Sequence, residues 1–158
     1  MTLPVPSPSS ESARRTMLGN RRRDTQPEIR LRRLLHAAGL RFRVDYAPDR
    51  ARLRRRAAIV FTRLRIAVFV DGCFWHGCPQ HFVAPVANAD YWKSKIDRNR
   101  ARDRETTSQL TEAGWLVLRF WEHQDPTDAV ETVIIAVRER QRTGTEATSY
   151  GHQSHADH

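Results

Sequence analysis

A dense group of metal-binding residue types stands directly after a short apolar run, and it limits how the surrounding chain can fold. Cys73, Cys78 and His81 follow the run from Ile66 to Val70, with four residues between the first two and two between the second pair. Residues so close in sequence can wrap one tetrahedral ion, and thiolates with imidazole favour zinc. A closed structural site needs a fourth ligand, for which His123 is the best candidate. The alternative is that both cysteines are small buried residues and His81 lies in a surface loop.

The length and composition favour a single domain that binds a polyanion. The chain has 158 residues, of which 39% are hydrophobic, and this is enough for one core. Its net charge of +9 favours nucleic acid as a partner, because neutralised phosphates release counterions. Alternatively, Arg is abundant for reasons of genome composition, since Lys occurs only at Lys93 and Lys95. There is no long apolar run and no apolar signal region at the N-terminus, so we expect a soluble cytoplasmic protein without a membrane segment.

Capping signals and hydrophobic periodicity predict an α/β domain over about residues 13–142. Residues 1–12 are rich in Ser and Pro and residues 143–158 are polar, so we expect both ends to be disordered. The predicted elements are a helix from the Thr25 and Glu28 capping box to Gly39, strands over 42–46, 57–61 and 66–70, a helix over 90–113 stopped by Gly114, a strand over 115–121 and a helix from Asp125. This order predicts a mixed central sheet flanked by helices.

Apolar spacing also predicts which faces are buried. In the first strand, Phe42, Val44 and Tyr46 alternate with charged residues, which is typical of a strand with one buried face. Along the long helix, steps of three or four residues predict an inward face that carries Trp92, Ile96, Asn99, Asp103, Thr107 and Leu110. A buried Asp103 either acts on a metal-bound water or forms a salt bridge with one of the many arginines.

Aromatic residues next to polar segments are a further candidate feature. Phe74, Trp75 and Trp92 are such residues. Aromatic side chains can wedge into a base stack when DNA must be opened, although most aromatic residues belong to the core. The sequence leaves both interpretations open.

Several segments together resemble one known family. They are Arg15-Thr16-Met17, Thr25 to Glu28, Phe69 to Cys78, Tyr91 to Asp103, and Ala113 to Glu122. Through them the chain, over roughly residues 14–124, resembles the very short patch repair (Vsr) DNA mismatch endonucleases. The resemblance implies a restriction-endonuclease-like α/β fold, a structural Zn²⁺ and a catalytic Mg²⁺. It also implies hydrolysis of one strand on the 5′ side of the thymine at a T:G mismatch.

The resemblance implies catalytic roles for four residues, of which the chain retains three, while the fourth, Asp71, stands where the better-known member of the family has an imidazole. His76 would be the general base or would orient the attacking water. Asp103 would help to hold water on the magnesium, and Glu28 would support the site from the first helix. Asp71 offers a carboxylate that can take part in metal binding directly.

Ala58 departs from the family pattern. The resemblance places at this position an Asp, the hard oxygen ligand of the catalytic magnesium, and alanine cannot bind the ion. Two explanations compete: an Asp-to-Ala change made to trap uncut DNA, and natural degeneration into a protein that binds without cutting. We favour the first, because the surrounding residues are those of an active member.

The resemblance further implies zinc ligands, DNA contacts and partners. The zinc ligands would be Cys73, Cys78, His81 and His123. The residues in or near the opened base stack would be Met17, Phe74, Trp75, Trp92, Lys95 and Asn99. A monomer would act on double-stranded DNA with a T:G mismatch in the bacterial cytoplasm, near the nucleoid, alongside a cytosine methyltransferase or mismatch-repair proteins.

Other functions compete with a mismatch endonuclease. A protein of this fold can also be a DNA-binding module without catalysis, or a nuclease that acts on another modified or irregular DNA site. A third class is a zinc-stabilised protein-interaction domain whose arginine surface is incidental. Steep salt dependence of duplex binding would separate the DNA-binding functions from the third class.

Overall fold

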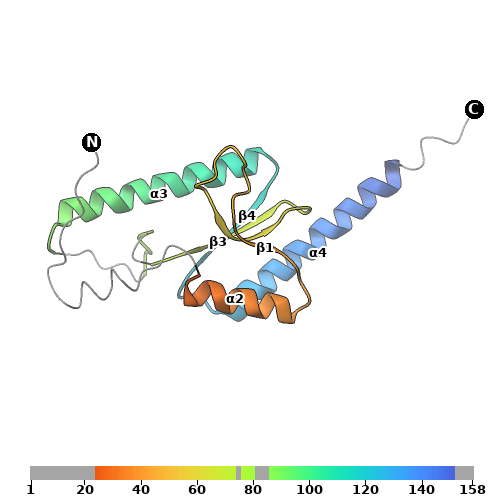
Figure 1. The fold of residues 1–158 in the computed structure, drawn as a ribbon, viewed down its shortest axis with the longest axis horizontal. Coiled ribbons are helices and arrows are strands. Elements are labelled where there is room, and N and C mark those ends of the chain that lie inside the picture. Colours follow the sequence, from red (N-terminus) through yellow and green to blue (C-terminus); the bar gives the residue numbers. More distant parts are fainter. Residues whose placement is uncertain (1–23, 74–75, 81–85, 152–158) are drawn as a thin grey trace, which may run out of the picture.

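The computed structural model describes residues 24–73, 76–80 and 86–151. Helices and strands follow one another in the order that the sequence predicts (Figure 1). The elements are α2 (Gln26–Ala37), β1 (Arg43–Tyr46), β2 (Ala57–Phe61), β3 (Ile66–Asp71), α3 (Ala89–Glu112), β4 (Leu116–Trp121) and α4 (Pro126–Gly151).

The four strands form one mixed sheet in the order β1-β2-β3-β4. β2 pairs antiparallel with both β1 and β3, which confirms the predicted hairpin. β3 and β4 are parallel, and α3 lies between them in the chain as the crossover. The register aligns Asp71 with Trp121 at the end of both strands. The carboxyl ends of β3 and β4 therefore meet at one edge of the sheet.

Helices cover both faces of the sheet, so the predicted α/β architecture is confirmed (Figure 1). On one face, Leu110 of α3 packs in a cluster with Ala57, Val60, Ala67 and Phe69. Removing these apolar surfaces from water is the main favourable contribution to folding. The inward face predicted for α3 is confirmed at its apolar positions.

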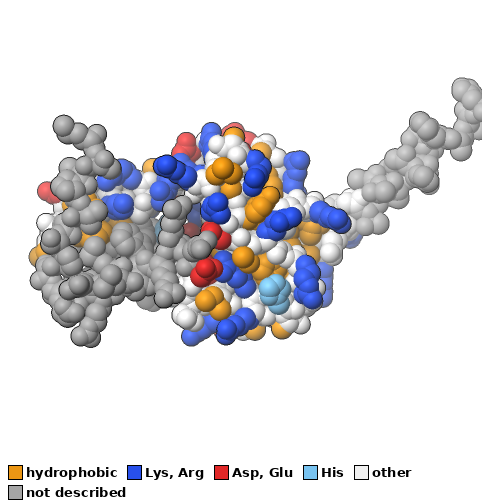
Figure 2. Space-filling view, in the orientation of Figure 1, with side chains coloured by type: hydrophobic (Ala, Val, Ile, Leu, Met, Phe, Trp, Pro, Cys, Tyr) orange, Lys and Arg blue, Asp and Glu red, His pale blue; other side chains and the backbone are white. Residues whose placement is uncertain are grey.

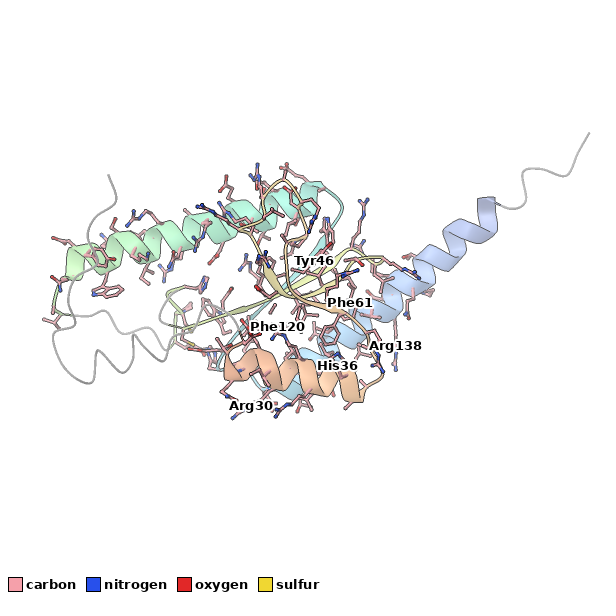
Figure 3. The ribbon with its side chains drawn as sticks, in the orientation of Figure 1. Arg30, His36, Tyr46, Phe61, Phe120 and Arg138 are labelled. Carbon is pink, nitrogen blue, oxygen red and sulfur yellow. The ribbon has the colours of Figure 1, made fainter. Side chains whose placement is uncertain are left out.

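On the opposite face, α2 and α4 pack against each other and against the sheet (Figure 1). Leu35, Ile59 and Val133 are fully buried there. Figure 3 shows Phe61 and Phe120 between the sheet and these helices. Within the residues that the structure describes, no helix has both the length and the apolar character needed to cross a membrane.

Local signals explain where the helices begin and end. Thr25 Oγ1 accepts a hydrogen bond from Glu28 N at 3.5 Å, which confirms the predicted cap of α2. Asp125 Oδ1 accepts one from Thr127 N at 2.8 Å at the start of α4. Just after α3, Gly114 adopts a φ of 89°, a left-handed conformation that favours glycine and ends the helix.

The predicted burial of β1 is wrong in detail. Val44 is 46% exposed, and Phe42 and Tyr46 pack in clusters on opposite faces of the sheet. Between them, Asp45 adopts a φ of 44°. Because this left-handed residue departs from regular strand backbone, the side chains around it do not keep a simple alternation.

The C-terminal helix is longer than the sequence predicts. α4 runs to Gly151, so the domain boundary expected at residue 142 lies inside a helix. No proline follows Pro126 in this helix, and each later residue can therefore continue the backbone hydrogen-bond ladder. Residues 1–12 and 152–158, for which disorder was also expected, lie outside the described residues.

Candidate active site and metal centre

The segments that follow β3 and β4 are hydrogen-bonded to each other at the edge of the sheet where both strands end. The backbone carbonyl of Asp71 accepts a hydrogen bond from Glu122 N at 2.9 Å. The Glu122 side chain accepts one from Cys73 N, also at 2.9 Å. The segments that follow the two strands are thus held side by side, at the type of position where α/β sheets bind ligands.

Two carboxylates, one from β3 and one from α3, face the same imidazole. His76 Nδ1 contacts Asp103 Oδ2 and lies 3.9 Å from Asp71 Oδ1. One ligand atom from each of the three residues lies within 4.8 Å of the others, so the group has the composition and spacing of a cation site. The structure therefore brings together three of the predicted catalytic residues, and the polar position of Asp103 on α3 has its partner.

Arg119 on β4 lies against both carboxylates. Its Nη1 donates hydrogen bonds to Asp71 Oδ1 at 2.9 Å and Oδ2 at 3.1 Å, and it lies 3.8 Å from Asp103 Oδ1. Burial raises the pKa of Asp71 above its ordinary value, while the charges of Arg119 and His76 act in the opposite direction. The salt bridge considered for Asp103 is therefore present together with the imidazole contact.

The loop that carries His76 is held from α3. Arg100 Nε donates to the His76 carbonyl oxygen at 3.3 Å, and Arg100 Nη2 donates to the Gly77 carbonyl oxygen. Gly77 has a φ of 64°, and a Cβ atom built there would lie 2.6 Å from Arg100 Cζ. Glycine at this position therefore permits both the turn of the loop and the close approach of the guanidinium.

Ala58 belongs to a second group of contacts, on the side of α2. It is 8% exposed and packs in the core cluster beneath α2 and α4. Arg32 donates to its carbonyl oxygen from Nε at 3.3 Å and from Nη2 at 3.1 Å. The same Nη2 lies 3.4 Å from Glu28 Oε2. Burial raises the pKa of Glu28 above its ordinary value, and the charge of Arg32 opposes this shift.

The sheet register relates the two groups. Ile59 of β2 pairs with Val68 of β3 in antiparallel register, so the start of β2, which carries Ala58, and the end of β3, which carries Asp71, lie toward the same edge of the sheet. The alanine and the carboxylate therefore stand on neighbouring strands near the same edge of the sheet.

Three of the four predicted zinc ligands, Cys73, Cys78 and His123, form one group. Cys73 Sγ lies 3.2 Å and Cys78 Sγ 3.6 Å from His123 Nδ1, and the three ligand atoms lie within 4.8 Å of one another. Burial, together with the neighbouring Cys78 thiol, raises the pKa of Cys73 to about 12. A bound cation would stabilise the thiolate form, and two sulfur atoms with an imidazole suit a metal such as zinc. His81, the fourth predicted ligand, lies outside the described residues.

Three of the residues predicted to contact DNA are described, and all lie on α3. Trp92 and Asn99 are each 8% exposed, and Lys95 is half-buried. The ring of Trp92 meets that of Tyr91 edge to face, with the ring centroids 5.1 Å apart. The other predicted contacts, Met17, Phe74 and Trp75, lie outside the described residues.

Three arginines that organise these groups were not singled out from the sequence. Arg119 interrupts the apolar run of β4, and a charge within an apolar strand is a signal that could have identified it. Arg32 stands four residues after Glu28 on the buried face of α2, which is a comparable signal. Arg100 has no such signal, because it lies among several arginines of α3.

Comparison with known proteins identifies relatives that span most of the chain. A family model described as DNA mismatch endonuclease Vsr matches residues 8–81. The type II nicking enzyme V.NaeI of Lentzea aerocolonigenes is 45% identical over 130 residues, which cover 82% of this chain and 78% of that protein.

Two further relatives extend this similarity. The type II nicking enzyme V.NmeDIP of Neisseria meningitidis serogroup C is 36% identical over 136 residues, which cover 83% of this chain and 89% of that protein. The DNA mismatch endonuclease Vsr of Escherichia coli (strain K12) is 42% identical over 101 residues, covering 63% of this chain and 62% of that protein. The chain belongs to the Vsr family of DNA endonucleases.

Proposed function

We propose that this chain is built to nick one strand of double-stranded DNA on the 5′ side of the thymine in a T:G mismatch, and that Ala58 disarms it. The names of its relatives, which are nicking enzymes and a mismatch endonuclease, support this activity. The observation that carries the proposal is the contact of His76 Nδ1 with Asp103 Oδ2, beside Asp71, at the edge where β3 and β4 end.

His76 is suited to take a proton from an attacking water. An ionised carboxylate only accepts hydrogen bonds, so the contact with Asp103 favours the tautomer that carries the ring proton on Nδ1. Nε2 is then the nitrogen that accepts the proton from water, and the charge of Asp103 stabilises the imidazolium that forms. The His76 side chain is 22% exposed, which leaves it within reach of water.

The side chain at position 58 does not fit a magnesium ion. When bound, magnesium would neutralise the charge that develops on the phosphodiester as its P–O bond breaks. The ion requires oxygen ligands, and the methyl group of Ala58 supplies none. The Arg32 and Glu28 contacts around Ala58 are intact, which favours a single disabling Asp-to-Ala change over general degeneration.

Zinc would have a structural role in this protein. Cys73, Cys78 and His123 would hold it, with His81 as the fourth ligand. Both cysteines belong to the segment between β3 and α3 that also carries His76, and His123 follows β4. A closed site of this kind would fix the loop relative to the sheet without taking part in hydrolysis.

Recognition of the mismatch would depend on an opened base stack. The net charge of +9 favours binding to phosphates, and Lys and Arg side chains are spread over the face shown in Figure 2. A wobble pair stacks poorly, so wedging it open costs less than opening a Watson–Crick pair. The residues proposed for this contact are Phe74, Trp75, Trp92, Met17, Lys95 and Asn99.

This function implies a setting in the bacterial cytoplasm, at the nucleoid, where mismatched DNA occurs. The proposed unit is a monomer with a restriction-endonuclease-like domain that starts near residue 13. A cytosine methyltransferase or mismatch-repair proteins would be its functional partners.

The proposal is tested by restoring the carboxylate. The Ala58→Asp variant, in magnesium, should nick the thymine strand of a T:G duplex and leave the matched duplex intact. Other mismatches belong in the same panel, and the cut is mapped on a denaturing gel. The Ala58→Asn variant is the matched control, because it adds a side chain of the same size without the negative charge.

The outcomes separate the competing functions. A folded Ala58→Asp variant that binds T:G duplex but nicks no substrate would make the chain a DNA-binding module. Nicking of another irregular duplex in preference to T:G would change the assigned substrate. Duplex binding that is weak and independent of salt would favour a protein-interaction domain.

A further inference from the structure

Arg119 makes several polar contacts beside the group formed by Asp71, His76 and Asp103. It lies on β4 with a side chain that is 21% exposed. Its Nη1 donates to both carboxylate oxygens of Asp71, its Nη2 to the Asp103 carbonyl oxygen at 3.3 Å, and its Nε to Thr107 Oγ1 at 2.9 Å. Its guanidinium carbon lies 4.3 Å from the centroid of the Phe69 ring. All three nitrogen atoms therefore have partners, from two other elements of the fold.

These contacts hold the Asp71 carboxylate and the part of the backbone that carries Asp103. The guanidinium is planar and presents its donors in a rigid fork, so it orients Asp71 as well as neutralising its charge. The bonds to the Asp103 backbone and to Thr107 hold α3 at a set distance from β4. Two carboxylates that face one imidazole also repel each other, and a cation between them reduces this repulsion.

We propose that Arg119 is a positioning residue, which acts through Asp71 and Asp103 to hold His76 in the orientation needed for proton transfer. Asp71 is then the counter-ion of Arg119, and it supports the imidazole instead of ligating a metal. The part of this inference that concerns catalysis rests on the proposed function. The part that concerns the orientation of His76 does not require cleavage.

A direct contact of Arg119 with DNA phosphate is the main alternative. Such a contact would need donors that point to solvent. Instead, Nε, Nη1 and Nη2 all bond to protein groups, and one face of the guanidinium lies on the Phe69 ring. This arrangement favours a role within the protein.

The catalytic part is tested in the Ala58→Asp background. Arg119→Gln should lower kcat about 10- to 100-fold, which is typical of residues that orient active-site ligands, with little change in KM for the T:G duplex. Arg119→Lys keeps the positive charge but not the paired donors of the guanidinium. Its kcat should therefore lie between those of Arg119→Gln and the Ala58→Asp parent. Arg65→Gln is the matched control: Arg65 is exposed, donates to the Ala113 carbonyl oxygen at 3.1 Å, and should leave kcat unchanged.

A double variant distinguishes action through Asp71 from an independent effect. Asp71→Asn combined with Arg119→Gln should lower kcat much less than the product of the two single losses. The proposal would be overturned if the two single losses in kcat multiply fully in the double variant. It would also be overturned if Arg119→Gln raises KM and leaves kcat unchanged, which would favour a phosphate contact.

The orientation of His76 is tested in the chain as it stands, without cleavage. The Nδ1–H proton of His76, assigned by its absence in His76→Gln, should give a slowly exchanging downfield NMR signal. The signal should persist in Arg65→Gln and broaden or disappear in Arg119→Gln. An unchanged signal in a folded Arg119→Gln variant would refute the positioning role. If Ala58→Asp nicks nothing, the proposed function fails, and this comparison still decides the role of Arg119.

Discussion

Arg32 joins α2 to β2 through the backbone of Ala58, because its Nε and Nη2 both donate to the Ala58 carbonyl oxygen, at 3.3 Å and 3.1 Å. Its Nη1 also pairs with Asp24 at 2.7 Å. On the other side of the sheet, Arg119 joins β4 to β3 and to α3. One arginine on each side thus connects the helices to the strands that carry the candidate site.

Replacing Arg32 should destabilise the protein substantially. Arg32→Met keeps the length of the side chain but removes the donors that Arg32 supplies to the buried Glu28 carboxylate and to the Ala58 carbonyl oxygen. We expect the free energy of unfolding to fall by about 2–4 kcal/mol, as measured by urea denaturation. Arg33→Met is the control, because Arg33 is exposed on the same helix and its loss should change stability by less than about 0.5 kcal/mol. Equal effects of the two changes would contradict the role given to Arg32.

Glu28 should make stability depend on pH in an unusual direction. Burial raises its pKa in the folded protein above the ordinary value of 4.5, so the folded state binds the proton more tightly than the unfolded chain. The stability that this group contributes is present below pH 4.5 and is lost as pH rises through the folded pKa. Glu28→Gln does not titrate, so its stability relative to the parent should increase from about pH 4 to about pH 7.

The comparison requires unfolding free energies of both proteins across that range. Glu112→Gln, at an exposed position of α3, serves as the control. If the difference in free energy of unfolding between Glu28→Gln and the parent stays constant with pH, the Glu28 carboxyl group has the same pKa in the folded and the unfolded protein.

The sequence predicts most of the fold because its signals are local. The Thr25 cap, the apolar runs of β2 and β3, and the glycine after α3 each depend on a few neighbouring residues. The burial of β1 could not be predicted, since it depends on the left-handed backbone of Asp45. The extension of α4 to Gly151 is not predicted, because the polar composition of the chain after residue 142 favours disorder.

The candidate site is predicted less completely, because its contacts join distant parts of the chain. Motif resemblance indicated His76 and Asp103, and the structure brings them into contact. The guanidinium beside them belongs to Arg119, which the sequence marks only as a charge within the apolar run of β4, without indicating its partners. Which arginine pairs with which carboxylate is determined by the strand register and by the crossover helix, and no spacing rule encodes either.

Loss of a proposed zinc ligand should lower the zinc content of the protein and loosen the loop that carries Cys73 and Cys78. The purified protein should contain about one zinc ion per chain, and Cys78→Ser should lower this content strongly, because serine is a poor ligand for a soft site. Zinc is measured by atomic emission, and the melting temperature should fall together with the metal content.

The control for this prediction is His36→Gln. His36 is exposed on α2 and stacks on Phe42, away from the cysteines, so its loss should leave the zinc content unchanged. A parent protein that binds no zinc after refolding with the ion would refute the metal centre.

Adding a methyl group at Gly77 should disturb the loop through Arg100. Gly77→Ala places an alanine at a φ of 64°, which costs about 1–2 kcal/mol, and its Cβ would overlap the guanidinium. The displaced Arg100 would lose its hydrogen bonds to the His76 and Gly77 carbonyl oxygens. We expect a lower melting temperature and, in the Ala58→Asp background, a lower kcat for nicking.

Gly39→Ala separates the two causes of this effect. Gly39 has a φ of 86°, but a Cβ atom there would meet nothing within 4 Å, so this variant should show backbone strain alone. The additional loss of stability in Gly77→Ala then measures the contact with Arg100, and only Gly77→Ala should lower kcat. If Gly39→Ala and Gly77→Ala lose the same stability and neither affects nicking, the link between Arg100 and the His76 loop has no functional role.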